Sequence, residues 1–225
     1  IHRPSRLLAA ADGRTIIMGG TPAYGMTGGG LLFWDRSSGQ RVLLTHQQVI
    51  PDQATISLVA LEGGKLLGGT TTSPGTGGET KAKQAELYLL DQATKAIQWH
   101  APLIPAAQGY TDLCLGPDGL VWGFADRTVF FVFDPATRKI VHQRSIAADF
   151  TATVSHQGPR VFVQGPKGEV YSLFVRAICQ IEPQDWQFKL LARSPVPLGA
   201  GGDICQGRIW FASGSQLCSY RLPRE

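Results

Sequence analysis

The chain has 225 residues, of which 43% are hydrophobic and 17% are charged, a balance opposite to that of disordered chains. The net charge of +4 comes from 21 scattered Lys and Arg residues, which argues against a nucleic-acid-binding stripe. No stretch approaches the ~18 apolar residues of a membrane-spanning helix, and 27 Gly with 14 Pro favour many short strands joined by tight turns.

A unit of four short β-rich runs recurs along the chain. Its copies begin at residues 6, 57, 112, 153 and 203, which are 51, 55, 41 and 50 residues apart. The first runs are Arg6-Leu-Leu-Ala, Ser57-Leu-Val-Ala, Asp112-Leu-Cys-Leu, Thr153-Val-Ser-His and Asp203-Ile-Cys. Each is followed by a turn, at Asp12-Gly13, Glu62-Gly63, Asp118-Gly119, Gln157-Gly158 and Gln206-Gly207. Turns of the Asp-Gly type between alternating hydrophobic residues predict hairpins.

The later runs follow in the same order in every copy. Second strands are expected from Thr15, Lys65, Leu120, Arg160 and Arg208, and third strands from Leu31, Leu87, Phe130, Ile178 and Gln216. After the third strand, Asp134-Pro135 predicts a turn that the Asp side chain caps. The last copy stops after its third strand, at Pro223.

This period predicts an all-β fold, a β-propeller with about five four-stranded blades. Such units cannot cover both faces alone, and stacking them around an axis buries the faces between blades. Five copies could close a small ring, or they form part of a six- to eight-bladed ring. Residues 1–225 are expected to form a single propeller domain. Because the chain starts at Ile1 without methionine, this domain is expected to lack N-terminal sequence.

The third copy carries a family resemblance. Gly-Pro-Asp-Gly-Leu-Val-Trp-Gly at 116–123, followed by Phe-Asp-Pro-Ala-Thr-Arg-Lys at 133–139, resembles the bacterial propellers that include streptogramin lyase and its YVTN, SMP-30 and NHL relatives. The resemblance implies a propeller that is a C–O lyase, a polysaccharide lyase, a lactonase or a binding scaffold. No catalytic motif of these families is found in the chain, so no catalytic residue is carried over.

Three segments between second and third strands are expected to be long loops, at 20–30, 69–84 and 164–176. They carry Tyr24, Thr70 and Lys81, and long loops on a rigid scaffold often carry function. The alternative is that they are tolerated insertions. Their glycines lack the GxxxxGK[ST] spacing of a phosphate-binding loop.

Five first-strand positions align at the mouth of the expected channel and are all polar: Arg6, Ser57, Asp112, Thr153 and Asp203. They could orient a hydroxyl-rich ligand, or they could simply bind water.

The four cysteines match no zinc or redox spacing and are interpreted as buried free thiols. Trp34, Trp122, Phe133 and Trp210 are interpreted as core between blades.

Lyase chemistry on a uronic acid would need a cation beside the carboxylate, a base and an acid. Arg3 or Arg6, with His2 and Tyr110, could supply these groups if they converge. Asp112 and Asp203 with backbone carbonyls could hold a divalent cation. No cofactor motif is present, so the cofactor is left unknown.

The sequence therefore predicts a ligand-binding, carbohydrate-active propeller from an exported bacterial protein, secreted or periplasmic, with a cytoplasmic location left open. If it is an enzyme, a lyase is expected, with His2, Tyr110 and Asp112 as catalytic residues. The expected partner is a carbohydrate or another small polar ligand. A non-catalytic protein-interaction scaffold is the alternative. The candidate ligand-binding residues are Arg3, Arg6, Tyr24, Gln53, Thr70, Lys81 and Asp203.

Overall fold

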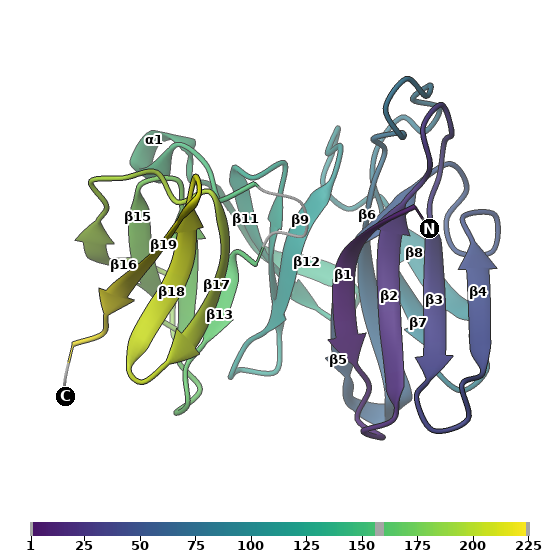
Figure 1. The fold of residues 1–225 in the computed structure, drawn as a ribbon, viewed down its shortest axis with the longest axis horizontal. Coiled ribbons are helices and arrows are strands. Elements are labelled where there is room, and N and C mark those ends of the chain that lie inside the picture. The colour runs from purple at the N-terminus through teal and green to yellow at the C-terminus, as the bar shows by residue number, and fades with distance from the viewer. Residues whose placement is uncertain (1, 156–159, 224–225) are drawn as a thin grey trace. The chain divides into compact units, whose positions relative to one another are not determined.

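The computed structural model describes residues 2–155 and 160–223. It is an all-β structure made of antiparallel sheets that follow one another along the chain, as the repeat predicted (Figure 1). The chain divides into two compact units, Ile1–Leu115 and Gly116–Glu225. Among the described residues, no helix is long and apolar enough to cross a membrane.

The first unit contains two complete sheets, with strand orders β1-β2-β3-β4 and β5-β6-β7-β8. Both are simple antiparallel meanders, because each strand pairs with its neighbour in sequence. Their strands are β1 (Arg3–Ala9), β2 (Thr15–Thr21), β3 (Gly30–Asp35), β4 (Arg41–Thr45), β5 (Ala54–Leu61), β6 (Lys65–Thr71), β7 (Leu87–Asp91) and β8 (Ile97–Ala101). A short 3-10 helix, η1 (Glu62–Gly64), joins β5 to β6, and the unit ends with β9 (Tyr110–Leu115).

The second unit holds the remaining strands. The sheet orders are β12-β11-β10-β9, β13-β14-β15-β16 and the three-stranded β17-β18-β19. The strands are β10 (Val121–Ala125), β11 (Val129–Asp134), β12 (Lys139–Ser145), β13 (Phe162–Gln164), β14 (Val170–Phe174), β15 (Ala177–Ile181), β16 (Phe188–Arg193), β17 (Ala200–Cys205), β18 (Arg208–Ser213) and β19 (Gln216–Arg221). One helical turn, α1 (Ala147–Phe150), follows β12. Within the part of the chain that the structure describes, the last sheet has three strands.

Aspartates cap the turns that follow the third strands. Asp134 accepts hydrogen bonds from the Ala136 amide at 2.8 Å and from the Thr137 hydroxyl at 2.7 Å. Asp35 and Asp91 cap the equivalent turns of the first two sheets. These hydrogen bonds favour the charged carboxylates and lower the pKa of all three. The capping predicted at Asp134 is confirmed and recurs in three sheets.

The fourth copy differs from the prediction. The strands expected at Thr153 and Arg160 are not the first and second strands of this sheet. The first strand is β13, and β14 occupies part of the segment 164–176 that was predicted to be a loop. The first hairpin turn is Gly165-Pro-Lys-Gly, with the same amide-to-carbonyl bonds as Gly116-Pro-Asp-Gly. Thr153 instead forms an isolated bridge with Phe174. His156 and the turn predicted at Gln157-Gly158 lie outside the described residues.

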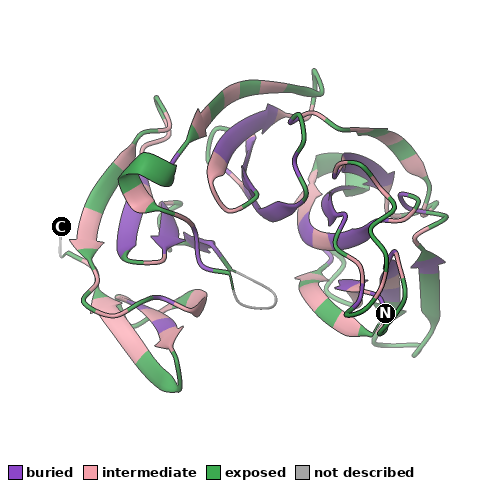
Figure 2. Cartoon of the chain, turned by 90° about the horizontal axis from the view of Figure 1, so that it is seen from above, coloured by how far each residue is buried: buried purple, intermediate pink, exposed green. Residues whose placement is uncertain are grey.

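Each unit buries its core between adjacent sheets, and the exposed residues concentrate on the outermost strands (Figure 2). In the first unit this core is mainly aliphatic, with Ile17, Leu31, Leu58 and Leu66 fully buried and Tyr88 completing it. In the second unit the core is mainly aromatic. Its rings belong to Phe124, Phe130, Phe162, Phe174 and Phe188, with centroids about 5–6 Å apart.

Several residue-level predictions about the core need correction. Trp122 and Phe133 are fully buried, as predicted. Trp34 is 38% exposed, because it alternates away from the buried face of β3, and Trp210 is only partly buried.

The four cysteines also differ from one another in burial. All four are free, but only Cys114 and Cys179 are buried. Cys218 is partly buried, and Cys205 is exposed beside the β17–β18 turn. The prediction of a buried thiol is therefore wrong for Cys205.

Candidate functional site

The candidate site lies at one end of the strands of the first unit, here called the loop rim. In an antiparallel meander the starts of odd strands and the ends of even strands share one end of the sheet. The loop rim therefore carries the two long connections of the first unit, 22–29 between β2 and β3 and 72–86 between β6 and β7. The starts of β1, β5 and β9 lie at the same end of their strands.

These two loops pack against each other. The Gly25 amide donates to the Thr76 carbonyl and the Gly75 amide to the Met26 carbonyl, both at 2.9 Å. A Cβ atom at Gly75 would lie 2.0 Å from the Ala23 carbonyl oxygen. Glycine here permits a close backbone approach, so the two loops pack together at this point.

A small polar recess forms where the start of β1 meets this loop pair. The Arg3 guanidinium donates to the Tyr24 hydroxyl at 2.6 Å, and its central carbon lies 5.0 Å from the centre of the Tyr24 ring. The His2 ring meets Tyr24 edge-on at 5.5 Å. The recess has a volume of about 60 Å³, and Pro74, Gly75 and Thr76 complete its wall with Thr21 and Pro22.

The charge of this recess is positive. No acidic residue lines it, and among the described residues no carboxylate lies within ion-pair distance of Arg3. Tyr24 is 61% exposed, so its hydroxyl, which accepts from Arg3, can still donate outward. The recess is therefore suited to an anionic or hydrogen-bond-accepting group.

A second polar feature joins two first strands. Arg6 of β1 forms an ion pair with Asp112 of β9 at 3.1 Å, and the Asp112 side chain is 2% exposed. Ser57 occupies the corresponding position of β5, since Ser57 pairs with Gly69 as Arg6 pairs with Gly19. The Ser57 hydroxyl donates to the Tyr110 carbonyl at 2.7 Å. Arg6 and Ser57 therefore occupy corresponding strand positions, and Asp112 contacts Arg6 from β9.

The charges of Arg6 and Asp112 affect the pKa of the Cys114 thiol. Burial, and secondarily the Asp112 carboxylate, raise the pKa of its thiol to about 12, while the positive charge of Arg6 acts in the opposite direction. The thiol is therefore neutral and a poor nucleophile at neutral pH.

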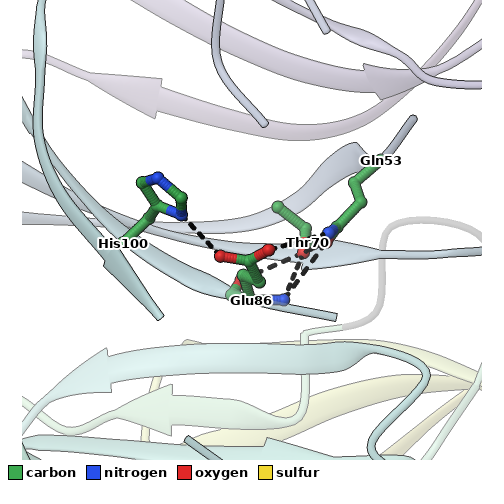
Figure 3. Close-up of polar contacts among 4 residues, drawn as sticks. All are labelled: Gln53, Thr70, Glu86 and His100. Atoms are coloured by element: carbon green, nitrogen blue, oxygen red, sulfur yellow. Dashed lines mark hydrogen bonds and ion pairs between the residues drawn. The ribbon is translucent and has the colours of Figure 1, made fainter. Parts of the chain in front are cut away.

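A polar network crosses the second sheet at the loop rim (Figure 3). Gln53 donates to Glu86 Oε1 at 3.3 Å, and the Glu86 amide donates to Thr70 Oγ1 at 2.8 Å. The Thr70 hydroxyl also donates to Gln53 Oε1. His100 Nδ1 lies 2.6 Å from Glu86 Oε2. Gln53 and Thr70 are buried, so this network satisfies their polar groups and fixes the entry to β7.

The remaining candidates are placed apart from the recess. Tyr110 is fully buried, and its hydroxyl accepts from the Ile104 amide at 3.4 Å. Lys81 is exposed in the 72–86 loop. Asp203 belongs to the second unit, has an 80% exposed side chain and pairs with Arg160 at 3.5 Å. It lies opposite Trp210 and directly follows a register shift of β17, as Arg6 and Ser57 directly follow register shifts of β1 and β5.

The structure also shows residues that the sequence reasoning did not select. Glu86 precedes β7 and is the carboxylate that links Gln53 to His100. The only sequence signal was a Glu just before an apolar strand at the end of a long loop. No group of three or more His, Cys, Asp or Glu side chains suited to a metal ion occurs in residues 2–155 and 160–223.

Comparisons with known proteins identify the fold. No family model and no curated protein matches the sequence. Among solved structures, the chain is similar to the extracellular domain of the putative one-component system BT4673 from B. thetaiotaomicron, with 11% identity and a TM-score of 0.64 over 97% of the chain. The chain spans 28% of that protein's length.

Two further propellers give similar values. The Dos1 propeller has 13% identity and a TM-score of 0.65, covering 92% of this chain and 50% of its own. The Cps50 (Swd1) β-propeller domain of Myceliophteria thermophila has 14% identity and a TM-score of 0.64, covering 96% and 68%. At such identities the likeness shows the fold alone: the chain is built of β-propeller blades.

Proposed function

We propose that this chain is a ligand-binding β-propeller that recognises an acidic, hydroxyl-rich ligand, such as the uronic acid units of a polysaccharide, at the loop rim of the first unit. The observation that carries the proposal is the Arg3 guanidinium, which is held by Tyr24 in a recess without acidic residues and pairs with no carboxylate of residues 2–155 and 160–223. A planar guanidinium can bind a carboxylate through two parallel hydrogen bonds.

The size of the recess supports binding of one group of a larger ligand. Pockets that enclose a whole small molecule measure ~300–1,000 Å³, whereas this recess measures about 60 Å³. It can receive a carboxylate, while the rest of the ligand would lie along the exposed loop surface beside Tyr24. Hydroxyl groups there would meet the many peptide and hydroxyl groups of the Gly/Thr-rich loops.

The geometry favours binding over lyase catalysis. A general acid or base must reach the reacting atoms directly or through one water. Tyr110 is buried beneath Ile104, and Asp112 is engaged by Arg6. The catalytic roles predicted for His2, Tyr110 and Asp112 stay predictions, as does secretion, with which the extracellular BT4673 domain agrees.

Isothermal titration with oligogalacturonate, compared with a neutral maltooligosaccharide of equal length, tests the proposal. We expect binding of the acidic oligomer only, and an affinity about tenfold lower in Arg3→Gln, equivalent to ~1.4 kcal/mol. Arg36→Gln, the same charge change at the exposed β3–β4 turn, is the matched control. Equal affinity for both oligomers, or an unchanged affinity in Arg3→Gln, would refute the proposal. Release of unsaturated uronic acid products would restore the lyase hypothesis.

A further inference from the structure

An open groove on the second unit is lined by residues of α1 and β16. Its volume is about 450 Å³, within the range of ~300–1,000 Å³ typical of ligand sites. The lining residues come from the end of β12, from α1, from β16 and from the β15–β16 turn that holds Gln187. None of them belongs to the loop rim, so this groove is independent of the site proposed above.

The floor of the groove is aromatic. Phe150 of α1 meets Phe188 of β16 edge-on, with centroids 5.8 Å apart, and Phe150 also stacks on Phe174 at 4.4 Å. Leu190 follows Phe188 on the same face of β16 and is 44% exposed. An exposed aliphatic side chain beside partly exposed rings provides an apolar surface that a partner's side chain could cover.

The two ends of the groove differ in charge. At one end the guanidinium carbon of Arg144 lies 5.4 Å from the centre of the Phe188 ring. The Arg144 guanidinium already donates hydrogen bonds to the Asp149 carboxylate at 2.5 Å and to the Gln187 side-chain oxygen at 3.1 Å. At the other end Arg193 is exposed, and no carboxylate among the described residues lies within 4.0 Å of it. The groove therefore presents one positive charge, on Arg193, that no carboxylate in the described part of the chain neutralises.

The wall beside Gln187 is held in place before any ligand binds. The Asp118 carboxylate accepts hydrogen bonds from the indoles of Trp186 at 2.9 Å and Trp122 at 3.2 Å. The Trp186 ring also lies 5.2 Å from the His142 ring of β12. These contacts fix the β15–β16 turn against the preceding sheet, so binding would cost little ordering.

We infer that this groove binds an extended acidic segment of a partner protein. The five steps from Phe188 to Arg193 along a strand span ~16 Å, which matches four or five extended residues better than a compact metabolite. An apolar side chain of the segment would cover Phe150 and Phe188, and a carboxylate about four residues away would pair with Arg193. The chemistry of the groove thus specifies both the conformation and the charge of its ligand.

Fluorescence anisotropy with a fluorescein-labelled peptide, Ser-Phe-Thr-Val-Thr-Glu-Glu-Ser, tests this inference on the full chain. We expect saturable binding that weakens at least about tenfold when both Glu residues become Gln, because the pair with Arg193 is lost. Arg193→Gln should weaken the acidic peptide to the same level and leave the Gln peptide unchanged. Leu190→Ser should weaken both peptides.

Lys139→Gln is the matched control, since it removes one positive charge from the exposed start of β12, at the far end from Arg144. Its affinity for the acidic peptide should equal that of the native chain. Absence of saturable binding, equal affinity for the Glu and Gln peptides, or equal weakening by Lys139→Gln and Arg193→Gln would each overturn the inference.

Discussion

The two units use the same four-stranded repeat but differ in where they depart from it. In the first unit the second and third strands are joined by the long segments 22–29 and 72–86. In the second unit the equivalent connections, 126–128, 175–176 and 214–215, are tight turns, and the long insertion is 146–161 between β12 and β13. The candidate sites follow these insertions: the recess lies under the paired loops, and the groove lies beside α1.

The two units also differ in the side chains that fill their cores. Between β1–β4 and β5–β8 the buried side chains are mostly aliphatic, whereas between the third and fourth sheets they are mostly phenylalanines. Area burial stabilises both, but rings add pairwise contacts of about 0.5–1.5 kcal/mol each. One repeat can thus be held by two kinds of packing, so the architecture depends on the hydrophobic pattern more than on particular residues.

The largest expected effect comes from truncating the centre of each core. Phe124 is fully buried and contacts Phe130, Phe162, Phe174 and Phe188. Phe124→Ala should lower the free energy of unfolding by about 4 kcal/mol, and Leu58→Ala in the first unit by about 3 kcal/mol, as measured by urea denaturation.

Hydrogen exchange followed by mass spectrometry would sharpen this comparison. We expect Phe124→Ala to accelerate exchange chiefly in β10–β16 and Leu58→Ala chiefly in β1–β8, because each removes contacts within its own unit. Leu7→Ala, at a residue that is 59% exposed, should change stability by less than about 0.5 kcal/mol. Equal acceleration throughout the chain in both variants would contradict separate cores.

The next effect concerns the ion pair between Arg6 and Asp112. Asp112→Asn would leave Arg6 without its counter-charge, but Arg6 is 21% exposed and can be partly rehydrated. We therefore expect a loss of about 2 kcal/mol, below the ~3–5 kcal/mol typical of fully buried pairs. The double-mutant cycle with Arg6→Met should give a coupling energy of about 1–2 kcal/mol. Additive effects would show that the two side chains do not interact in solution.

Much of the fold could be predicted from the sequence because turn chemistry and period agreed. Asp118-Gly119 and Asp134-Pro135 mark the turns of the third sheet, and the structure places turns at both. The fourth copy differs because its hairpin turn was predicted at Gln157-Gly158 and residues 164–176 were predicted to be a loop. Gly165-Pro-Lys-Gly repeats the Gly116-Pro-Asp-Gly turn, and aligning these two would have placed β13 and β14 correctly.

The candidate site was less predictable, because it depends on contacts between distant segments. The Arg6–Asp112 pair joins residues of corresponding strand positions, so the repeat could indicate it. Asp203 also follows a register shift, as Arg6 does, but it belongs to the second unit and pairs with Arg160, so its place beside Arg6 and Asp112 stays a prediction. The contact between Arg3 and Tyr24 depends on how two glycine-rich loops pack, and no periodicity encodes that packing.

The smallest expected effect is a dependence of folding stability on pH that arises in the second unit. His142 of β12 packs between Phe130 and Trp186, and its Nε2 atom is buried without a hydrogen-bond partner among the described residues. Burial, and secondarily the positive charge of Arg144, lower the pKa of His142 below its usual value of 6.5. The unfolded chain therefore takes up this proton at a higher pH than the folded chain does, so protonation favours unfolding.

Stability should consequently fall as the pH drops through about 6.5 toward 5, and the loss should stop once the folded histidine also titrates. His142→Gln should flatten this part of the profile of unfolding free energy against pH. Val141→Gln, on the opposite and exposed face of β12, should leave it unchanged. An unaltered slope in His142→Gln would mean that the ring is hydrated in solution and that the edge of the aromatic core is looser than that of its aliphatic counterpart.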